Sequence, residues 1–145
     1  MGILTNIVAA DEDEIEAIGE SLHPIDEWSG IEMREVDTAK IATLHCLLTG
    51  DLFDDAIGYY EPVYISAAEG AMVLHLAEEV KERLAELDEE TLETIAAELA
   101  ATEEFEYADW EDEAIAAMLV ALAELARLAE SQGQALFVWM HPLRT

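Results

Sequence analysis

The balance between charged and apolar residues is the feature that most limits what this chain can fold into. It carries 34 Asp and Glu against six Lys and Arg, a formal net charge of −28 on 145 residues. Acidic chains stay disordered when they have too little apolar surface to bury. Here 52% of the residues are hydrophobic, so the carboxylates must surround a sizeable core. We expect one folded domain over residues 1–145.

The same charge restricts the partners of the chain. Nucleic-acid phosphates and anionic lipids are bound by clustered Lys and Arg, so we expect neither a nucleic acid nor a membrane as partner. The N-terminal sequence lacks the charged and apolar regions of a signal peptide. No stretch approaches the apolar length of a membrane span, and the lone Cys46 has no second cysteine with which to form a disulfide. We therefore expect a cytoplasmic protein.

Three segments have the composition of β-strands. Residues 3–9 are partly alternating and β-branched, and residues 71–76 can form a second strand. Residues 135–140 are apolar throughout, which predicts a strand in the centre of its sheet. Residues 24–36 are expected to be irregular, and residues 51–69 to form a long loop.

Helical periodicity accounts for most of the remaining chain. The strongest helix is expected over Asp112–Ser131, where apolar residues recur at i, i+3, i+4 and i+7. Asp37 precedes a helix over Thr38–Thr49, and Gly50 follows it in the position of a left-handed cap. Shorter helices are expected after Asp11, around Val80 and after Asp88. About five helices packed on a small sheet of three to four strands indicate an α+β fold, with strands near both ends of the chain.

Short motifs along almost the whole chain are similar to one bacterial family. They are the opening MGI…IVAADEDEIEAI, the helix Lys40–Gly50 that ends in Leu-Thr-Gly, and the strand running into a helix over Val73–Val80. An aromatic-acidic segment around Trp110, a long helix and a final apolar strand follow in the same order. In these respects the chain resembles the YfbM-like family, a domain of unknown function. The resemblance implies an α+β fold over residues 1–145 and brings no established activity or catalytic residues.

Motifs for catalysis, cofactors and metals are missing from the sequence. It contains no glycine-rich phosphate loop and no GxSxG, so we assign no catalytic residue and no cofactor. The four His residues do not fall at zinc-ligand spacings, and we expect no metal site. A nucleophilic pair of Cys46 and His45 is disfavoured because a reactive thiolate needs a helix N-terminus or cationic neighbours. Both are expected to be structural.

Two segments combine aromatic residues with carboxylates and are the predicted partner-binding residues. Tyr and Trp are favoured at binding hot spots, and carboxylates around them suit a basic protein partner. The alternative for both segments is that the aromatics anchor a loop on the core while the acids face water. The predicted residues are Glu103, Glu104, Glu106, Tyr107, Asp109, Trp110, Glu111 and Asp112 in the first segment and Asp51, Asp54, Asp55, Tyr59 and Tyr60 in the second.

Three functional hypotheses follow from these observations. The first is an immunity protein or inhibitor that neutralises a basic, nuclease-like toxin by electrostatic occlusion. The second is a housekeeping protein whose acidity serves only solubility or adaptation to salt. The third is an enzyme whose site is built from scattered carboxylates and His. The first is the hypothesis that we carry forward.

Overall fold

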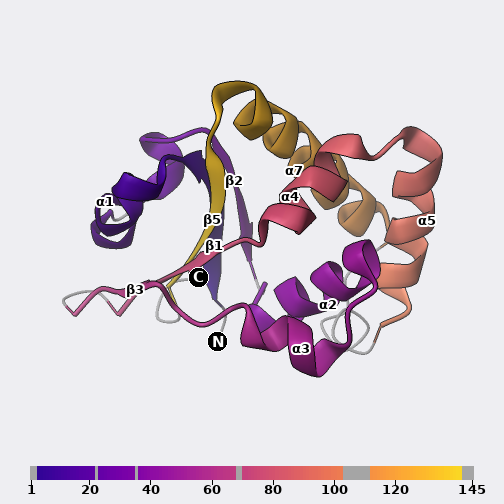
Figure 1. Ribbon diagram of the computed structural model, residues 1–145, viewed down its shortest axis with the longest axis horizontal. Helices are drawn as coiled ribbons and strands as arrows, with labels where there is room; N and C mark the ends of the chain where they lie inside the picture. The colour runs from indigo at the N-terminus through magenta and orange to yellow at the C-terminus, as the bar shows by residue number, and fades with distance from the viewer. Residues whose placement is uncertain (1–2, 22, 35, 68–69, 103–111, 142–145) are drawn as a thin grey trace.

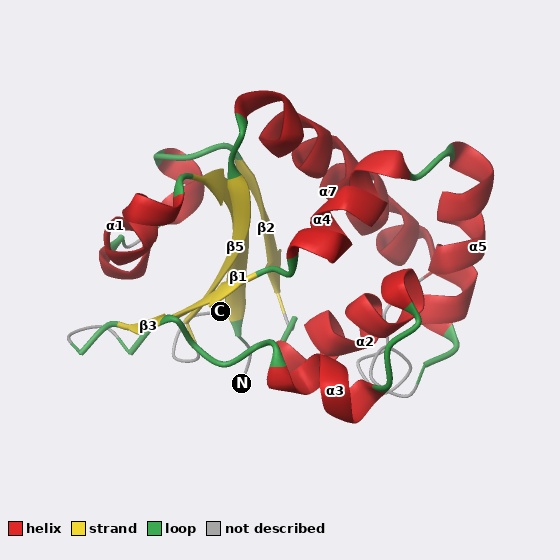
Figure 2. Ribbon diagram, viewed as in Figure 1, coloured by secondary structure: helices red, strands yellow, loops and turns green. Residues whose placement is uncertain are grey.

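The computed structural model describes residues 3–21, 23–34, 36–67, 70–102 and 112–141. Within these ranges an antiparallel sheet of five strands carries helices on both faces, so the predicted α+β class is confirmed (Figures 1 and 2). The strand order is β2-β1-β5-β4-β3. The strands are β1 (Leu4–Ala10), β2 (Gly30–Arg34), β3 (Tyr64–Ile65), β4 (Met72–His75) and β5 (Ala135–His141).

Strands β1 and β5 form the centre of the sheet and are buried along their whole lengths. They pair without interruption from Leu4 opposite His141 to Ala10 opposite Ala135. A strand covered on both faces has a nearly continuous apolar sequence, which is why residues 135–140 predicted a central strand. That prediction is confirmed, and the strand extends by one residue to His141.

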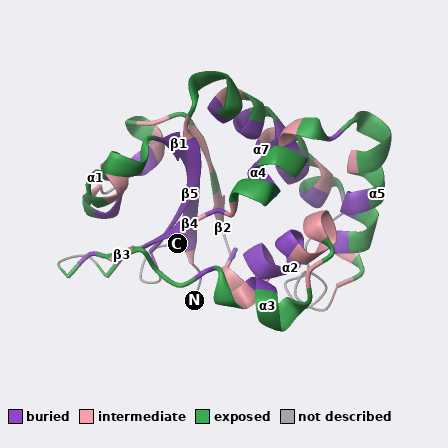
Figure 3. Ribbon diagram, in the orientation of Figure 1, coloured by how far each residue is buried: buried purple, intermediate pink, exposed green. Residues whose placement is uncertain are grey.

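Most helices cover one face of the sheet and enclose the larger core, with their outer faces exposed (Figure 3). The stripe predicted on the longest helix is buried there, including Ile115, Leu119 and Leu122. No helix in the described part of the chain is both long and apolar enough to span a membrane. The helices of this face are α2 (Thr38–Thr49), α3 (Phe53–Gly58), α4 (Glu78–Glu86), α5 (Glu89–Ala100) and α7 (Asp112–Gln132).

The opposite face of the sheet is covered by short elements. They are the 3-10 helices η1 (Glu12–Glu14) and η2 (Pro24–Asp26) and the helix α1 (Ile15–Glu20). Beneath them lies a smaller core around Phe137 and Trp139 of β5. Figure 1 shows α1 on its side of the sheet, opposite the thicker helical layer.

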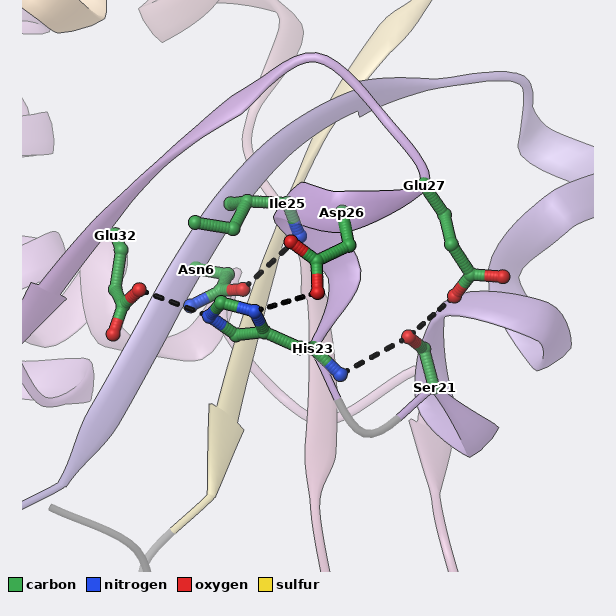
Figure 4. A network of polar contacts seen from close by, with 7 residues as sticks. All are labelled: Asn6, Ser21, His23, Ile25, Asp26, Glu27 and Glu32. Atoms are coloured by element: carbon green, nitrogen blue, oxygen red, sulfur yellow. Dashed lines mark hydrogen bonds and ion pairs between the residues drawn. The ribbon is translucent and has the colours of Figure 1, made fainter.

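A polar network fastens η2 to the two strands beside it (Figure 4). The buried Asn6 of β1 accepts a hydrogen bond from the backbone N–H of Ile25 at 3.2 Å. The His23 ring contacts Asp26 through Nδ1 at 3.0 Å and Glu32 of β2 through Nε2 at 2.9 Å. These contacts hold a segment whose sequence has no strong periodicity.

Two segments expected to lack regular structure contain short elements instead. Residues 24–36 include η2 and β2, and residues 51–69 include α3 and β3, so both expectations were wrong. The edge strand β2 has only Ile31 and Met33 on its apolar side, too few for the pattern to stand out. Helix α3 has six residues and no side-chain cap. The sheet therefore has five strands, where three to four were expected.

Truncation of Leu122 tests the packing of α7 on the larger core. The side chain is 1% exposed, so Leu122→Ala should lower the free energy of unfolding by about 2–5 kcal/mol. Val120 on the same helix is 44% exposed, and Val120→Ala should change it by no more than about 0.5 kcal/mol. Urea denaturation measures both, and equal losses would contradict the orientation of the helix.

The pH dependence of stability tests the network around His23. The hydrogen bond with Glu32, followed by that with Asp26, raises the pKa of His23 above its ordinary value of 6.5. A raised folded pKa means that the protonated ring stabilises the fold below the unfolded pKa and loses this effect as pH rises through the folded pKa. The stability difference between wild type and His23→Gln should therefore be largest below pH 6.5 and shrink as the pH rises above it. A difference that does not change as the pH rises would refute these contacts of His23.

Candidate binding surface

The end of α2 determines where the next segment of the chain lies. Asp37 begins the helix by accepting a hydrogen bond from the backbone N–H of Lys40 at 3.0 Å. Gly50 ends it with φ of 83°, a left-handed conformation that favours glycine because it has no Cβ. The Thr49 hydroxyl then accepts a hydrogen bond from the backbone N–H of Asp51 at 3.2 Å. This turn directs Asp51 back towards the helix.

A chain of hydrogen bonds connects Tyr60, His45 and Asp51. The Tyr60 hydroxyl lies 2.8 Å from Nδ1 of His45, and Nε2 of the same ring lies 2.7 Å from Oδ2 of Asp51. The phenol oxygen also forms a hydrogen bond with the backbone of Ala77. Because this hydrogen bond lowers the pKa of Tyr60, the Ala77 N–H is its donor. The phenol hydrogen is then free for Nδ1 of His45, and Nε2–H donates to Asp51. The ring thus links α2 to both ends of the α3 segment.

The electrostatics of this chain separate its two ends. Burial raises the pKa of Tyr60, against a smaller opposing effect of the Ala77 hydrogen bond. The hydrogen bond from His45 lowers the pKa of Asp51, helped by the Thr49 hydroxyl and opposed by desolvation. The phenol is 3% exposed, whereas the Asp51 side chain is 38% exposed. An enclosed phenol cannot meet a substrate. The hydrogen bonds of Tyr60, His45 and Asp51 therefore anchor α3 and do not form a nucleophile with its base.

The anchored segment exposes apolar and acidic side chains together. Leu52 is 74% exposed, Phe53 40% and Tyr59 62%, and Asp54 and Asp55 in the first turn of α3 are exposed as well. We call these five residues the α3 surface. Large exposed apolar side chains next to one another are typical of interaction sites.

Two hollows border the α3 surface, and Asp51 lines both of them. One, of about 360 Å³, is lined by Asp51, Asp55, Gly58 and Tyr59. The other, of about 370 Å³, lies between α2 and α3 and is lined by Thr43, Cys46, Leu47, Asp51, Leu52, Phe53 and Thr102. Because Phe53 forms a wall of the second hollow, an apolar group of a partner could lie against the ring.

The described cations are largely occupied within the fold. Lys40 and Lys81 are buried, and Lys81 donates to the backbone carbonyl of Gln134 at 2.9 Å. Arg127 of α7 donates to the carbonyl of Leu87 at 2.6 Å, at the end of α4, where a positive charge is favourable. Only Arg83 among the four cations whose side chains are described lies exposed without such a backbone contact. The outer surface is therefore dominated by carboxylates.

The predicted partner-binding residues fall into three groups. Asp51, Asp54, Asp55 and Tyr59 are brought together at the α3 surface and its hollows. Tyr60 points inward to His45 and contributes no exposed surface. Glu103, Glu104, Glu106, Tyr107, Asp109, Trp110 and Glu111 lie outside the described residues, and of Asp112 only the backbone at the start of α7 is described.

Sequence reasoning missed two contributors to this surface. Leu52 and Phe53 were passed over because two adjacent apolar residues have no periodicity, although such a pair between acids is a usable signal. The role of His45 depends on contacts with Asp51 and Tyr60. Both of its ring nitrogens face these partners rather than Cys46, so the structure does not form the Cys–His pair.

Comparison with known proteins finds a similar structure whose function is unknown. No family model matches the chain, and no curated protein matches it. Among solved structures, it is similar to the crystal structure of YfbM from Escherichia coli, a protein of unknown function. The identity is 16%, the match covers 94% of this chain and 99% of that chain, and the TM-score is 0.47. That protein bears the name of the family whose motifs the sequence resembles.

Adjacent tyrosines provide a matched test of the anchor. Tyr60→Phe keeps the ring but leaves Nδ1 of the buried His45 without its hydroxyl partner, which should cost about 1–3 kcal/mol of unfolding free energy. Tyr59→Phe removes a hydroxyl from a side chain that is 62% exposed, so the same measurement should show little change. Losses of equal size would argue against the hydrogen-bond chain.

Proposed function

We propose that this chain is a small acidic binding protein that covers the functional site of a basic protein with its α3 surface. Its most concrete form is an immunity protein or inhibitor that neutralises a basic, nuclease-like toxin in the cytoplasm. One observation carries the proposal. Leu52, Phe53 and Tyr59 are exposed beside Asp54 and Asp55 on a segment anchored by the hydrogen bonds of the buried His45.

The chemistry of the α3 surface suits such a partner. Aromatic side chains are enriched among the residues that contribute most to binding energy. Carboxylates around them attract a basic partner and accelerate association. Because the hydrogen bonds of His45 hold the segment in place, less conformational freedom is lost on binding. In the proposed mechanism the carboxylates occupy the places of substrate phosphates while Phe53 or Tyr59 fills a pocket.

The wide distribution of acids favours one alternative, a housekeeping protein whose acidity serves only solubility or adaptation to salt. Exposed glutamates also cover the outer faces of α4 and α5, far along the chain from α3. The enzyme hypothesis gains less support. A general acid needs a raised pKa, whereas hydrogen bonds lower the pKa of Glu14, Asp51 and Asp88.

Charge reversal at two matched pairs of acidic residues distinguishes binding by the α3 surface from nonspecific attraction by the acidic protein as a whole. The tagged protein is used to capture partners from its native lysate, with washes at low and then high salt. One variant is Asp54→Lys with Asp55→Lys, and its control is Glu89→Lys with Glu90→Lys. Both pairs are acids in the first turn of a helix, so net charge and helix-end electrostatics change alike.

We expect one basic protein in stoichiometric amount, retained by the wild type and the control and lost from the α3 variant. With that partner purified, Phe53→Ala should weaken Kd by about 30-fold, or about 2 kcal/mol, and the exposed-residue control Val120→Ala should not. Equal loss from both charge variants, or many basic proteins released together at modest salt, would favour the solubility alternative.

A further inference from the structure

Three side chains from separate elements converge at one end of the sheet. They are Glu12 of η1, His75 at the end of β4 and Glu78 at the start of α4. Nε2 of His75 lies 3.8 Å from a carboxylate oxygen of Glu12 and 3.9 Å from one of Glu78. One ligand atom from each residue lies within 4.8 Å of the other two.

The topology of the sheet produces this convergence. Strands β1 and β4 both run antiparallel to β5, one on each side of it. They are therefore parallel to each other, and their C-terminal residues lie at the same end of the sheet, beside the start of β5. Glu12 follows the end of β1 by two residues, and Glu78 follows His75 by three.

Contacts behind the cluster orient two of the three side chains. The His75 ring packs edge-on against Phe137, with ring centroids 5.1 Å apart. Oε2 of Glu78 lies 2.8 Å from Nζ of Lys81, while Oε1 of the same carboxylate faces His75. Lys81 is itself buried and held by the carbonyl of Gln134.

The spacing suits a shared ion better than hydrogen bonds. Separations of 3.8 and 3.9 Å exceed the roughly 2.7–3.2 Å of a hydrogen bond between nitrogen and oxygen. They are slightly longer than the roughly 3.3 Å between ligand atoms around a tetrahedral ion with bonds of about 2.0–2.1 Å. A small inward rotation of the exposed Glu12 and Glu78 side chains would close that difference.

From this arrangement we propose that Glu12, His75 and Glu78 bind one divalent ion of the Zn²⁺ class, with the remaining coordination open to solvent. Imidazole nitrogen with two carboxylate oxygens is a donor set that Zn²⁺ and Co²⁺ accept, whereas Mg²⁺ and Ca²⁺ prefer oxygen alone. Asp11, Asp13 and Glu14 are sequence neighbours of Glu12, and their carboxylates add negative potential that favours a cation.

The surroundings of His23 show why the same residue types elsewhere do not form such a site. His23 also lies between two carboxylates, but Asp26 contacts Nδ1 and Glu32 contacts Nε2, on different sides of the ring. Two acids on different nitrogens cannot share one ion with that ring. At His75 both carboxylates face the same nitrogen. This proposal departs from the sequence-based expectation of no metal site, which considered only ligands close together in the chain.

Zn²⁺ binding by the full chain in an excess of Mg²⁺ tests the proposal. Mg²⁺ occupies sites made of carboxylates alone and competes poorly for an imidazole nitrogen. Calorimetry and metal analysis after dialysis would measure affinity and stoichiometry. The variants are His75→Gln and Glu12→Gln, with His23→Gln as the matched control. Glu12 is three-quarters exposed (75%), so Glu12→Gln provides a variant whose folding is not at risk.

We expect one Zn²⁺ per chain for the wild type and His23→Gln, and an affinity at least about 10-fold weaker for Glu12→Gln and His75→Gln. Nuclear magnetic resonance of the imidazole nitrogens should show Zn²⁺ shifting Nε2 of His75 alone. Absence of Zn²⁺ retention in excess Mg²⁺, or equal retention by all variants, would overturn the site. A shift of the His23 ring in place of His75 would overturn it as well.

Discussion

The pairing of β1 with β5 is the constraint on which the rest of the structure depends. Two segments from opposite ends of the chain form the fully buried centre of the sheet. Each has one row of side chains in the larger core and the other in the smaller one. Both helical layers are therefore placed by the same two strands. Because β1 and β4 run in the same direction, Glu12, His75 and Glu78 also meet at one end of the sheet.

Scarcity of positive charge shapes the polar chemistry of the molecule. Buried or backbone-bonded cations such as Lys81 and Arg127 support the fold. Imidazoles then meet carboxylates in three different arrangements. At His23 two acids bind opposite ring nitrogens, and at His45 an acid and a phenol do so. At His75 two acids face one nitrogen. The contacts of His23 make a pH-dependent contribution to stability, and those of His45 anchor the segment beneath a binding surface. The arrangement at His75 is a candidate ion site.

The sequence predicted the elements that have strong local signals. Helix α2 has both a capping Asp37 and the terminal Gly50, and its bounds agree with the prediction. The prediction for α7 is one residue short at its end, because apolar periodicity persists through the helix. In contrast, β2, β3 and α3 were missed. These short elements are stabilised by contacts with neighbouring elements and not by a local pattern. Helix α3, for example, is held by the hydrogen bonds of the flanking Asp51 and Tyr60 with His45.

The sequence by itself determined that the chain can fold around a large apolar core. For the candidate binding surface it determined only the composition, an acidic and partly aromatic segment after Gly50. Only the tertiary structure decided that Tyr59 faces solvent while Tyr60 is enclosed. Both rings contact His45, but only Tyr60 forms a hydrogen bond with it, whereas Tyr59 stacks on the imidazole. The tertiary structure also decided which carboxylates meet an imidazole. Residues 12, 75 and 78 become neighbours only through strand pairing. Pairing sets the distances between segments that are far apart in the sequence, and local sequence spacing does not encode those distances.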